Sequence, residues 1–371
     1  MRFLLACGGS GGHINPALAV AELLRSDGHE VLFVGTPHGL ERTLVCKAGF
    51  AIEFAEIHSL AHSLSLRAII RNIGVLVKMA GALRKARGIV RRFSPHAALG
   101  TGGYASYPPL RAAAQLGVPV LVHESNALPG VTTKMLAKHA HKILVGMEAC
   151  RDSYSQKEKT EVVGTPVRGD FFSASRLQAR QELRLDNRPL VVSFFGSQGA
   201  RDMNTLILGV MEQLKKTDAW QHIHVTGSKA YGDIRKRAAD LGLDGIHGLR
   251  IEEYLHNMPQ VMASADLVIC RAGASTLAEL AATGRPAVLI PSANVANDHQ
   301  NANAKVFSAQ GGAEMCAESA LNVQKLYELT DSLLQNTKKL DRMKLALEKS
   351  AFPDSAQRIQ RLLYEAGKSL N

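Results

Sequence analysis

Short apolar runs alternate with amphipathic helical patterns along most of this chain, and many of these runs end in loops rich in glycine or polar residues. A first series of runs lies at residues 3–7, 30–34, 51–57, 97–100, 118–123 and 142–145, and a second at 190–195, 222–226, 267–270 and 287–290. Strands that alternate with helices along a chain form parallel sheets of βαβ units. The sequence therefore predicts an α/β protein with two Rossmann-like, doubly wound domains.

The change from one series to the next is marked by Gly164, Thr165 and Pro166, because glycine and proline punctuate structural elements. A chain of 371 residues is long enough for two domains. We place the first domain at 1–165 and the second at 166–351. An amphipathic helix pattern follows at about 352–371, and the pattern alone does not say where this helix packs.

The five cysteines are scattered without C-x-x-C spacing, which is typical of buried thiols in a reducing compartment. The apolar run at 3–7 is too short for the core of a signal peptide. No stretch approaches the roughly 18 apolar residues of a membrane span. These features predict a cytosolic protein.

The net charge of +11 is concentrated in one segment. No acidic residue occurs between Glu56 and Glu124, and the basic residues in this window are Arg67, Arg71, Lys78, Arg84, Lys85, Arg87, Arg91, Arg92 and Arg111. The window begins with a basic amphipathic helix pattern, whose candidate membrane-facing residues are Leu66, Arg67, Ile70, Arg71, Ile73, Val77 and Lys78. A core-facing helix with a solvated basic edge is the ordinary alternative. An anionic membrane is favoured over nucleic acid, because aromatic interleaving and nucleic-acid motifs are missing.

Residues 8–13 (GGSGGH) follow the first predicted strand and precede a helix that we expect to start at Asn15 and Pro16. Glycines let backbone N–H groups approach a phosphate, and a helix N-terminus adds partial positive charge, so Ser10, Gly11 and Gly12 are candidate anion-binding residues. A tight turn is the alternative. The dinucleotide fingerprint fails because Ile14 stands where glycine is required, and the Walker motif is also missing.

His13 closes this first glycine loop. A neutral imidazole adds little to phosphate binding, but its ordinary pKa near neutrality suits it to accept a proton from a hydroxyl group. A structural histidine is the alternative, and the position at the mouth of a glycine loop favours the base.

Two further loops follow strands of the first domain, GTGGYASYPP at 100–109 and HESNALPG at 123–130. Ligands bind at the carboxyl ends of the strands in open α/β sheets, so we expect the three loops to share one cleft. Tyr104, Glu124 and Asn126 are the side chains expected to face it. For Glu124 the alternative is a helix-capping acid before Pro129.

The second domain repeats the arrangement. Ser197 and Gln198 lie in a glycine loop at 194–204 and are candidate phosphate donors. The segment CRAGASTLAEL predicts a helix starting near Ala274, where Glu279 can accept bonds from ribose hydroxyls. His299 and Gln300 suit sugar hydroxyls or a solvated helix start. No D-x-D pair or carboxylate cluster suggests a metal, and we expect no cofactor.

Taken together and in order, the motifs GGSGGHINP, GTGGYASYPP, HESN, GTPVR, GSQGARDMN, CRAGASTLAEL and DHQNANA resemble the peptidoglycan glycosyltransferases of the MurG type over roughly residues 1–370. The resemblance implies a GT-B fold, with two Rossmann-like domains facing a central cleft and the final helix completing the first domain. It also implies transfer of N-acetylglucosamine from UDP-GlcNAc to the C4 hydroxyl of lipid I, with inversion, to give lipid II.

The resemblance assigns roles to the matching residues of this sequence. Ser10, Gly11 and Gly12 lie near the phosphates, His13 is the base, and Tyr104 and Glu124 take acceptor-side catalytic positions. Asn126 and Arg168 contact the donor. The remaining donor-binding residues are Ser197 and Gln198 at the diphosphate, Leu255 at the uracil, Ala274, Ser275, Thr276, Leu277, Ala278 and Glu279 at the phosphate and ribose, and Gln300 at the sugar.

The resemblance further implies a peripheral protein on the cytoplasmic face of the cell membrane, with roles in cell shape and division. Other cell-wall synthesis proteins are candidate partners. Two enzyme alternatives remain open, a glycolipid synthase that uses a UDP-sugar and a UDP-GlcNAc epimerase on the same fold. A basic nucleic-acid-binding module is the non-enzymatic alternative, and it predicts salt-sensitive oligonucleotide binding.

Overall fold

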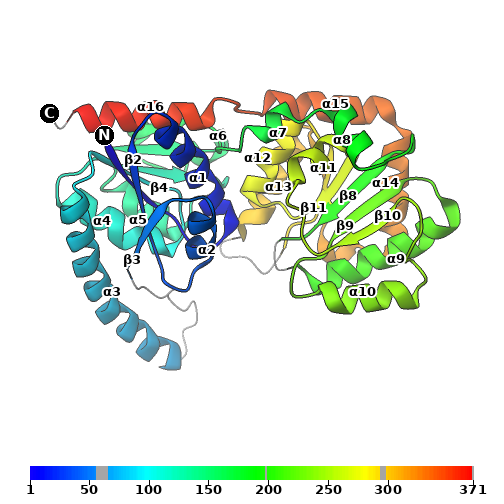
Figure 1. The fold of residues 1–371 in the computed structure, drawn as a ribbon, viewed down its shortest axis with the longest axis horizontal. Coiled ribbons are helices and arrows are strands. Elements are labelled where there is room, and N and C mark those ends of the chain that lie inside the picture. Colours follow the sequence, from blue (N-terminus) through cyan, green and yellow to red (C-terminus); the bar gives the residue numbers. More distant parts are fainter. Residues whose placement is uncertain (56–65, 197–198, 293–297, 370–371) are drawn as a thin grey trace. The chain divides into compact units, whose positions relative to one another are not determined.

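The computed structural model describes residues 1–55, 66–196, 199–292 and 298–369; of residues 66–78 it describes the backbone only. The chain divides into two compact units (Figure 1). We call Met1–Arg168 with Phe352–Asn371 the N-terminal unit, and Gly169–Ala351 the C-terminal unit.

The N-terminal unit contains a seven-stranded parallel sheet in the order β3-β2-β1-β4-β5-β6-β7. Its strands are β1 Arg2–Ala6, β2 Glu30–Gly35, β3 Ala51–Phe54, β4 Ala97–Gly100, β5 Val120–Glu124, β6 Lys142–Val145 and β7 Thr160–Val162. The strand order reverses between β1 and β4. Ligands of open α/β sheets bind beside the loops that follow the strands at such a point.

Helices cover both faces of this sheet. They are α1 Gly11–Ser26, α2 Leu40–Lys47, α3 Leu66–Phe93, α4 Tyr107–Gln115, α5 Val131–Ala137, α6 Glu148–Arg151 and α16 Ser355–Lys368, with 3₁₀ turns η1 Tyr104–Ser106 and η2 Lys157–Lys159. Side chains alternate along β1: Phe3 and Leu5 pack in the core cluster that includes Leu363 of α16, and Leu4 packs in the one that includes Ile89 of α3. The apolar runs of the sequence are therefore strands buried on both faces.

The C-terminal unit contains a six-stranded parallel sheet in the order β10-β9-β8-β11-β12-β13. Its strands are β8 Leu190–Phe194, β9 Gln221–Val225, β10 Leu249–Glu252, β11 Leu267–Cys270, β12 Ala287–Leu289 and β13 Ala313–Met315. Its helices are α7 Asp170–Ser173, α8 Arg176–Glu182, α9 Arg201–Thr217, α10 Tyr231–Asp240, α11 Met258–Ser264, α12 Ala274–Thr283, α13 His299–Ala309, α14 Val323–Gln335 and α15 Thr337–Lys349, with the 3₁₀ turn η4 Glu318–Ala320. The prediction of two doubly wound α/β domains is confirmed.

The basic window forms α3, which packs against α4. In the half of α3 whose side chains are described, Ala82, Ala86, Ile89 and Val90 are buried in the core, whereas Arg84, Lys85, Arg87, Arg91 and Arg92 are exposed. Arg92 pairs with Glu53 at 2.7 Å. The side chains proposed to face a membrane, Leu66, Arg67, Ile70, Arg71, Ile73, Val77 and Lys78, lie outside the described residues. Within the described part of the chain, no helix is long and apolar enough to span a membrane.

The final helix, α16, packs on the N-terminal unit, where Figure 1 shows it in red beside α1. Ile359, Leu362 and Leu363 are buried in the same core cluster as Phe3. The Tyr364 hydroxyl donates to the Asp27 carboxylate at 3.0 Å. The apolar face of this amphipathic helix therefore packs into the core of the N-terminal unit.

Candidate functional site

The first glycine loop joins β1 to α1, and the helix starts earlier than the sequence suggested. The expected start at Asn15 and Pro16 is wrong, because α1 begins at Gly11 with the extended residue Ser10 as its N-cap. The N–H groups of His13 and Ile14 donate to the Ser10 carbonyl at 3.0 and 3.2 Å. The first N–H groups of a helix have no carbonyl partner within it. The glycines of this loop therefore present the N-terminus of α1 itself, the site that favours an anion.

His13 is held by the loop that follows β4. Its Nδ1 lies 3.1 Å from the Thr101 carbonyl oxygen, and the Thr101 hydroxyl donates to the His13 carbonyl at 2.6 Å. A carbonyl oxygen only accepts, so Nδ1 carries the hydrogen of this bond. In the neutral ring Nε2 then keeps its lone pair, which is the tautomer that a general base needs.

The loops after β1 and β4 approach each other at two glycines. A Cβ on Gly103, whose φ is +81°, would lie 2.0 Å from the Gly8 carbonyl oxygen, and one on Gly102 would lie 2.6 Å from His13 Nδ1. Only glycine fits these places. Tyr104 follows directly and is 36% exposed, near the first glycine loop. The structure thus brings Ser10, His13 and Tyr104 to one edge of the sheet, as the loops' positions predicted.

Glu124, at the end of β5, is almost completely buried and accepts four hydrogen bonds from the loop that follows it and from the first turn of α5. Its Oε1 accepts from the Asn126 N–H and side-chain amide at 3.1 and 2.8 Å, and its Oε2 accepts from the Gly130 N–H and the Thr133 hydroxyl at 2.8 and 2.5 Å. Gly130 is the N-cap of α5. This is the geometry of the helix-capping alternative, in which the carboxylate fixes Asn126 and the start of α5.

His123, one residue before Glu124, is fully buried and lies 2.8 Å from the Gly164 carbonyl oxygen through Nε2. Burial lowers the pKa of its imidazole, and His13 lowers it further. A buried neutral histidine of this kind holds two loops together and does not transfer protons with solvent.

In the C-terminal unit the glycine loop precedes α9. Ser197 and Gln198 lie outside the described residues. Just beyond them, a Cβ on Gly199 would lie 2.0 Å from the Thr226 carbonyl oxygen, and the buried Asn204 amide donates to that same oxygen at 2.9 Å. The loop is therefore anchored to the carboxyl end of β9, next to the N-terminus of α9.

The helix expected near Ala274 is confirmed, because α12 begins at that residue with Gly273 as N-cap. Its first turns carry the six donor-binding candidates: Ala274 and Leu277 are buried, and Ser275, Thr276, Ala278 and Glu279 are half-buried. Gln300 accepts from the Ser292 N–H at 2.8 Å, which links α13 to the segment after β12. Leu255 is half-buried in the loop after β10, and Arg168 is exposed at the end of the first part of the N-terminal unit.

Arg271 was not predicted from the sequence. Its guanidinium donates to the Ile290 carbonyl at 3.0 Å and to Glu318 at 2.7 Å, and it lies 5.8 Å from the centre of the Phe195 ring. It thereby connects the ends of β8, β11 and β12, after which three of the candidate loops start. The arginine directly after β11, at the carboxyl edge of the sheet, was the available signal.

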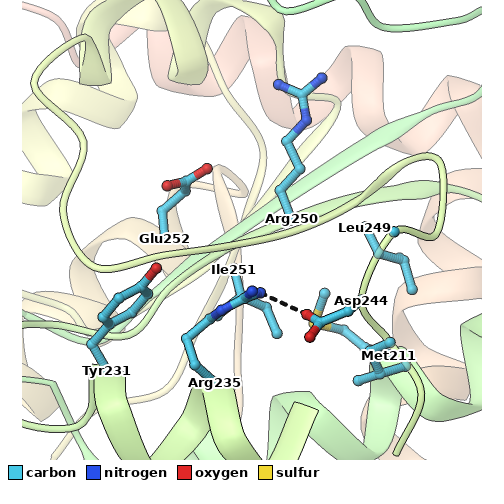
Figure 2. A pocket seen from close by; sticks show the side chains of 10 residues that line it. Met211, Tyr231, Arg235, Asp244, Leu249, Arg250, Ile251 and Glu252 are labelled. Atoms are coloured by element: carbon cyan, nitrogen blue, oxygen red, sulfur yellow. Dashed lines mark ion pairs between the residues drawn. The ribbon is translucent and has the colours of Figure 1, made fainter. Parts of the chain in front are cut away.

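A cavity of about 290 Å³ lies elsewhere in the C-terminal unit, between α10 and the edge strand β10 (Figure 2). Tyr231 and Glu252 stand at one end, and the ion pair of Arg235 with Asp244 crosses it at 2.8 Å. None of the residues predicted for the site lines this cavity. Among the described residues there is also no cluster of histidine, cysteine and carboxylate side chains suited to a metal ion.

Comparisons with known proteins agree with this arrangement. Residues 3–145 match the glycosyltransferase family 28 N-terminal domain, and residues 190–359 match the family 28 C-terminal domain. The chain is 36% identical over 366 residues to a UDP-N-acetylglucosamine–N-acetylmuramyl-(pentapeptide) pyrophosphoryl-undecaprenol N-acetylglucosamine transferase of Thermoanaerobacter sp., covering 98% of this chain and 99% of the relative.

Solved structures give the same result. The crystal structure of Acinetobacter baumannii MurG matches with a TM-score of 0.76 at 27% identity, covering 98% of this chain and 99% of that one. A UDP-GlcNAc 2-epimerase from Neisseria meningitidis, bound to UDP-GlcNAc, matches with a TM-score of 0.66 at 14% identity, covering 98% of this chain and 100% of that one. The second likeness shows the fold alone.

Proposed function

The chain belongs to glycosyltransferase family 28, and we propose that it transfers N-acetylglucosamine from UDP-GlcNAc to the C4 hydroxyl of lipid I, giving lipid II with inversion. The observation that carries the proposal is a full-length relative that is named for this reaction. The geometry of His13 supports it, because an inverting transfer needs a base beside the attacking hydroxyl.

His13 is the proposed base. The Thr101 carbonyl holds Nδ1, so Nε2 accepts the proton of the acceptor hydroxyl as that oxygen attacks the anomeric carbon of the sugar. The bond from this carbon to the UDP oxygen breaks at the same time, and the leaving diphosphate gains negative charge. The N-termini of α9 and α12 supply partial positive charge that stabilises such an anion.

The donor is proposed to bind to the C-terminal unit through Ser197, Gln198, Leu255, the start of α12 from Ala274 to Glu279, and Gln300. Asn126 and Arg168 are the proposed donor contacts from the N-terminal unit. Arg271 is proposed to hold the donor-binding loops in place, because its side chain contacts the ends of the strands that precede them. Tyr104 is the proposed contact to the acceptor, whereas the hydrogen bonds of Glu124 support a role in positioning Asn126.

We propose that the N-terminal unit also binds the acceptor and rests on the anionic inner surface of the cell membrane, as a peripheral protein on its cytoplasmic face. The exposed arginines and lysine of α3 support this, because a basic helix surface attracts anionic lipid headgroups. Roles in cell shape and division, and contacts with other cell-wall synthesis proteins, follow from lipid II production and are part of the same proposal.

The proposal is tested by UDP release from UDP-GlcNAc in detergent, with and without a soluble lipid I analogue. Release that requires the analogue, with a disaccharide product, supports transfer to lipid I. Release that requires diacylglycerol supports a glycolipid synthase, and UDP-N-acetylmannosamine formed without any acceptor and without release of UDP supports an epimerase. Either of the last two results rejects the proposal.

A further inference from the structure

A carboxylate is completely buried behind the first glycine loop. Glu41 is the second residue of α2, and its side chain has 0% exposure. Glutamate is almost never fully buried unless its oxygens are paired, because a buried charge without hydrogen bonds is costly. The proposed reaction gives this side chain no role.

The partners of Glu41 come from two different loops. Its Oε1 accepts from the Thr36 N–H at 2.9 Å and from the Thr36 hydroxyl at 2.6 Å, both in the turn between β2 and α2. Its Oε2 accepts from the Gly9 N–H at 3.3 Å, in the first glycine loop. One oxygen is thus anchored in the protein core, and the other holds the loop that carries Ser10 and His13.

The backbone packs closely around the Glu41 carboxylate at three glycines. A Cβ on Gly35 would lie 2.6 Å from Glu41 Cγ, one on Gly39 would lie 2.2 Å from the carboxylate oxygens, and one on Gly8 would lie 3.1 Å from Oε1. Three glycines therefore allow the backbone to close around this carboxylate. Such close packing fixes the position of Oε2 and, through the hydrogen bond, the position of Gly9.

We propose that Glu41 is a positioning residue, which holds Gly9 so that the N-terminus of α1 and the His13 imidazole face the reacting groups. Because the Gly9 N–H is bound to Glu41, the phosphate-facing donors are the N–H groups that follow it, at the start of α1. This inference rests on the proposed function of the same site.

The first test compares Glu41→Gln with Glu148→Gln. In the glutamine variant the side-chain oxygen can stay with Thr36, and its amide group then meets the Gly9 N–H, which breaks that hydrogen bond. We expect kcat to fall about 10- to 100-fold, as for a catalytic group misplaced by about 1 Å, with the Kd of UDP-GlcNAc unchanged. Glu148 is a matched control, since it is also in the first turn of a helix of the N-terminal unit but is exposed and pairs only with Arg151 in the contacts described. An unchanged kcat in Glu41→Gln overturns the proposal.

The second test follows the Gly9 amide directly in NMR spectra of glycine-labelled protein. We expect its proton resonance to move upfield in Glu41→Gln and to stay in place in Glu148→Gln. Thr36→Val, which removes only the hydroxyl donor, covers the case in which Glu41→Gln does not fold. It is expected to shift the same resonance and to lower kcat to a smaller extent. A fall in kcat without movement of the Gly9 resonance overturns the proposal. If the unaltered protein does not transfer sugar at all, the proposed function fails, whereas the resonance still reports whether Glu41 holds Gly9.

Discussion

His13 is the residue on which the proposed chemistry depends most, because it is the proposed base. Its Nδ1 donates to the Thr101 carbonyl, which fixes the tautomer that this role requires. We expect His13→Ala to lower kcat by about 10²- to 10⁴-fold, the usual contribution of a general base, while the Kd of UDP-GlcNAc stays the same. UDP release measures the first quantity, and calorimetric titration measures the second. His38→Ala, at an exposed histidine of the same unit, is the control. Full activity of His13→Ala would falsify the assignment of the base.

Substitutions at Glu124 and its partners test whether the buried carboxylate caps the start of α5. Thr133→Val removes one of its four donors, together with the bond from the same hydroxyl to the Gly130 carbonyl, so we expect the free energy of unfolding to fall by about 1 kcal/mol with nearly normal kcat. Glu124→Gln disturbs Asn126 as well, and we expect a larger loss of stability together with lower activity. Denaturant unfolding and transfer assays distinguish the two effects. A direct catalytic role for Glu124 predicts inactivity at unchanged stability.

At this scale the sequence identified residues that follow strands in glycine-rich loops, such as His13 and Glu124. It did not identify Glu41, which holds the first glycine loop, or Arg271, which lies beside the loops of the C-terminal unit. A helix-surface acid such as Glu41 is normally solvated, and nothing in its own segment shows that Gly8 and Gly35 close around it in space. Positioning residues act through contacts between distant segments, and one sequence does not display such contacts.

Among the elements, the pair β8 and β9 carries a buried polar cluster. His222 Nε2 and His224 Nδ1 each lie 2.8 Å from the Ser193 hydroxyl oxygen, and all three residues have 0% exposure. Burial lowers the pKa of His222 to about 3 and that of His224 to about 4. Both histidines are therefore neutral in the folded protein at pH values where the unfolded chain, with pKa values near 6.5, takes up protons.

The sign of the pH dependence follows from this difference. The stability that comes from keeping His222 and His224 neutral is fully present above about pH 6.5. It is lost as the pH falls toward the pKa values of the folded protein, because the unfolded state binds more protons. Two histidines give a slope of up to about 2.7 kcal/mol per pH unit between roughly pH 4 and 6. Urea unfolding of the C-terminal unit at several pH values measures it. His222→Leu is expected to reduce the slope by about half.

A second prediction about a single element concerns helix α3. Its exposed basic residues face solvent in the described half, so replacing Arg84, Lys85 and Arg87 by serine removes three positive charges without opening the core. Each basic residue near an anionic membrane contributes about 1 kcal/mol, and we expect vesicle binding to weaken at least 30-fold. Cosedimentation with vesicles of 30% phosphatidylglycerol, at ~0.1 and ~0.5 M salt, measures the effect. Equal binding by both proteins assigns membrane contact to another surface.

The elements that the sequence missed are the strands β7, β10 and β13, all at sheet edges. Each has only three or four residues and includes a glutamate, because an edge strand is not covered on both sides and needs no continuous apolar run. The central strands were predicted because they are buried on both faces. The start of α1 was misplaced because Asn15 and Pro16 imitate a helix start, while the helix extends back through the glycines to Ser10.

At the scale of the whole molecule, a substitution in α16 measures how much this helix stabilises the N-terminal unit. Leu363 is fully buried in the core cluster that includes Phe3 and Leu5 of β1, so we expect Leu363→Ala to lower the free energy of unfolding of the N-terminal unit by about 2–5 kcal/mol. The C-terminal unit does not share this core cluster, and its UDP-GlcNAc affinity should remain normal. Calorimetry with and without UDP-GlcNAc separates the two transitions. A shift in the ligand-sensitive transition contradicts the expected independence of the two units.

The sequence predicted the number of domains and their class, because these follow from local periodicity. It predicted that 352–371 is an amphipathic helix, but not from its own pattern where it docks. That information lies in the contacts of this helix with α1 and in Asp27, which accepts a hydrogen bond from the Tyr364 hydroxyl. Only the family resemblance suggested the return of this helix to the first domain.

The return of α16 also fixes an order of events during synthesis. A ribosome that has finished Arg168 has about 200 residues still to add before α16 is available, which takes roughly 10 to 40 s at common elongation rates. Until then the core around Phe3 and Leu5 lacks the side chains of α16, because the whole C-terminal unit is synthesised before that helix. The unit encoded first is therefore completed last, and chaperones that protect apolar surface have their longest period of contact with the N-terminal half of the nascent chain.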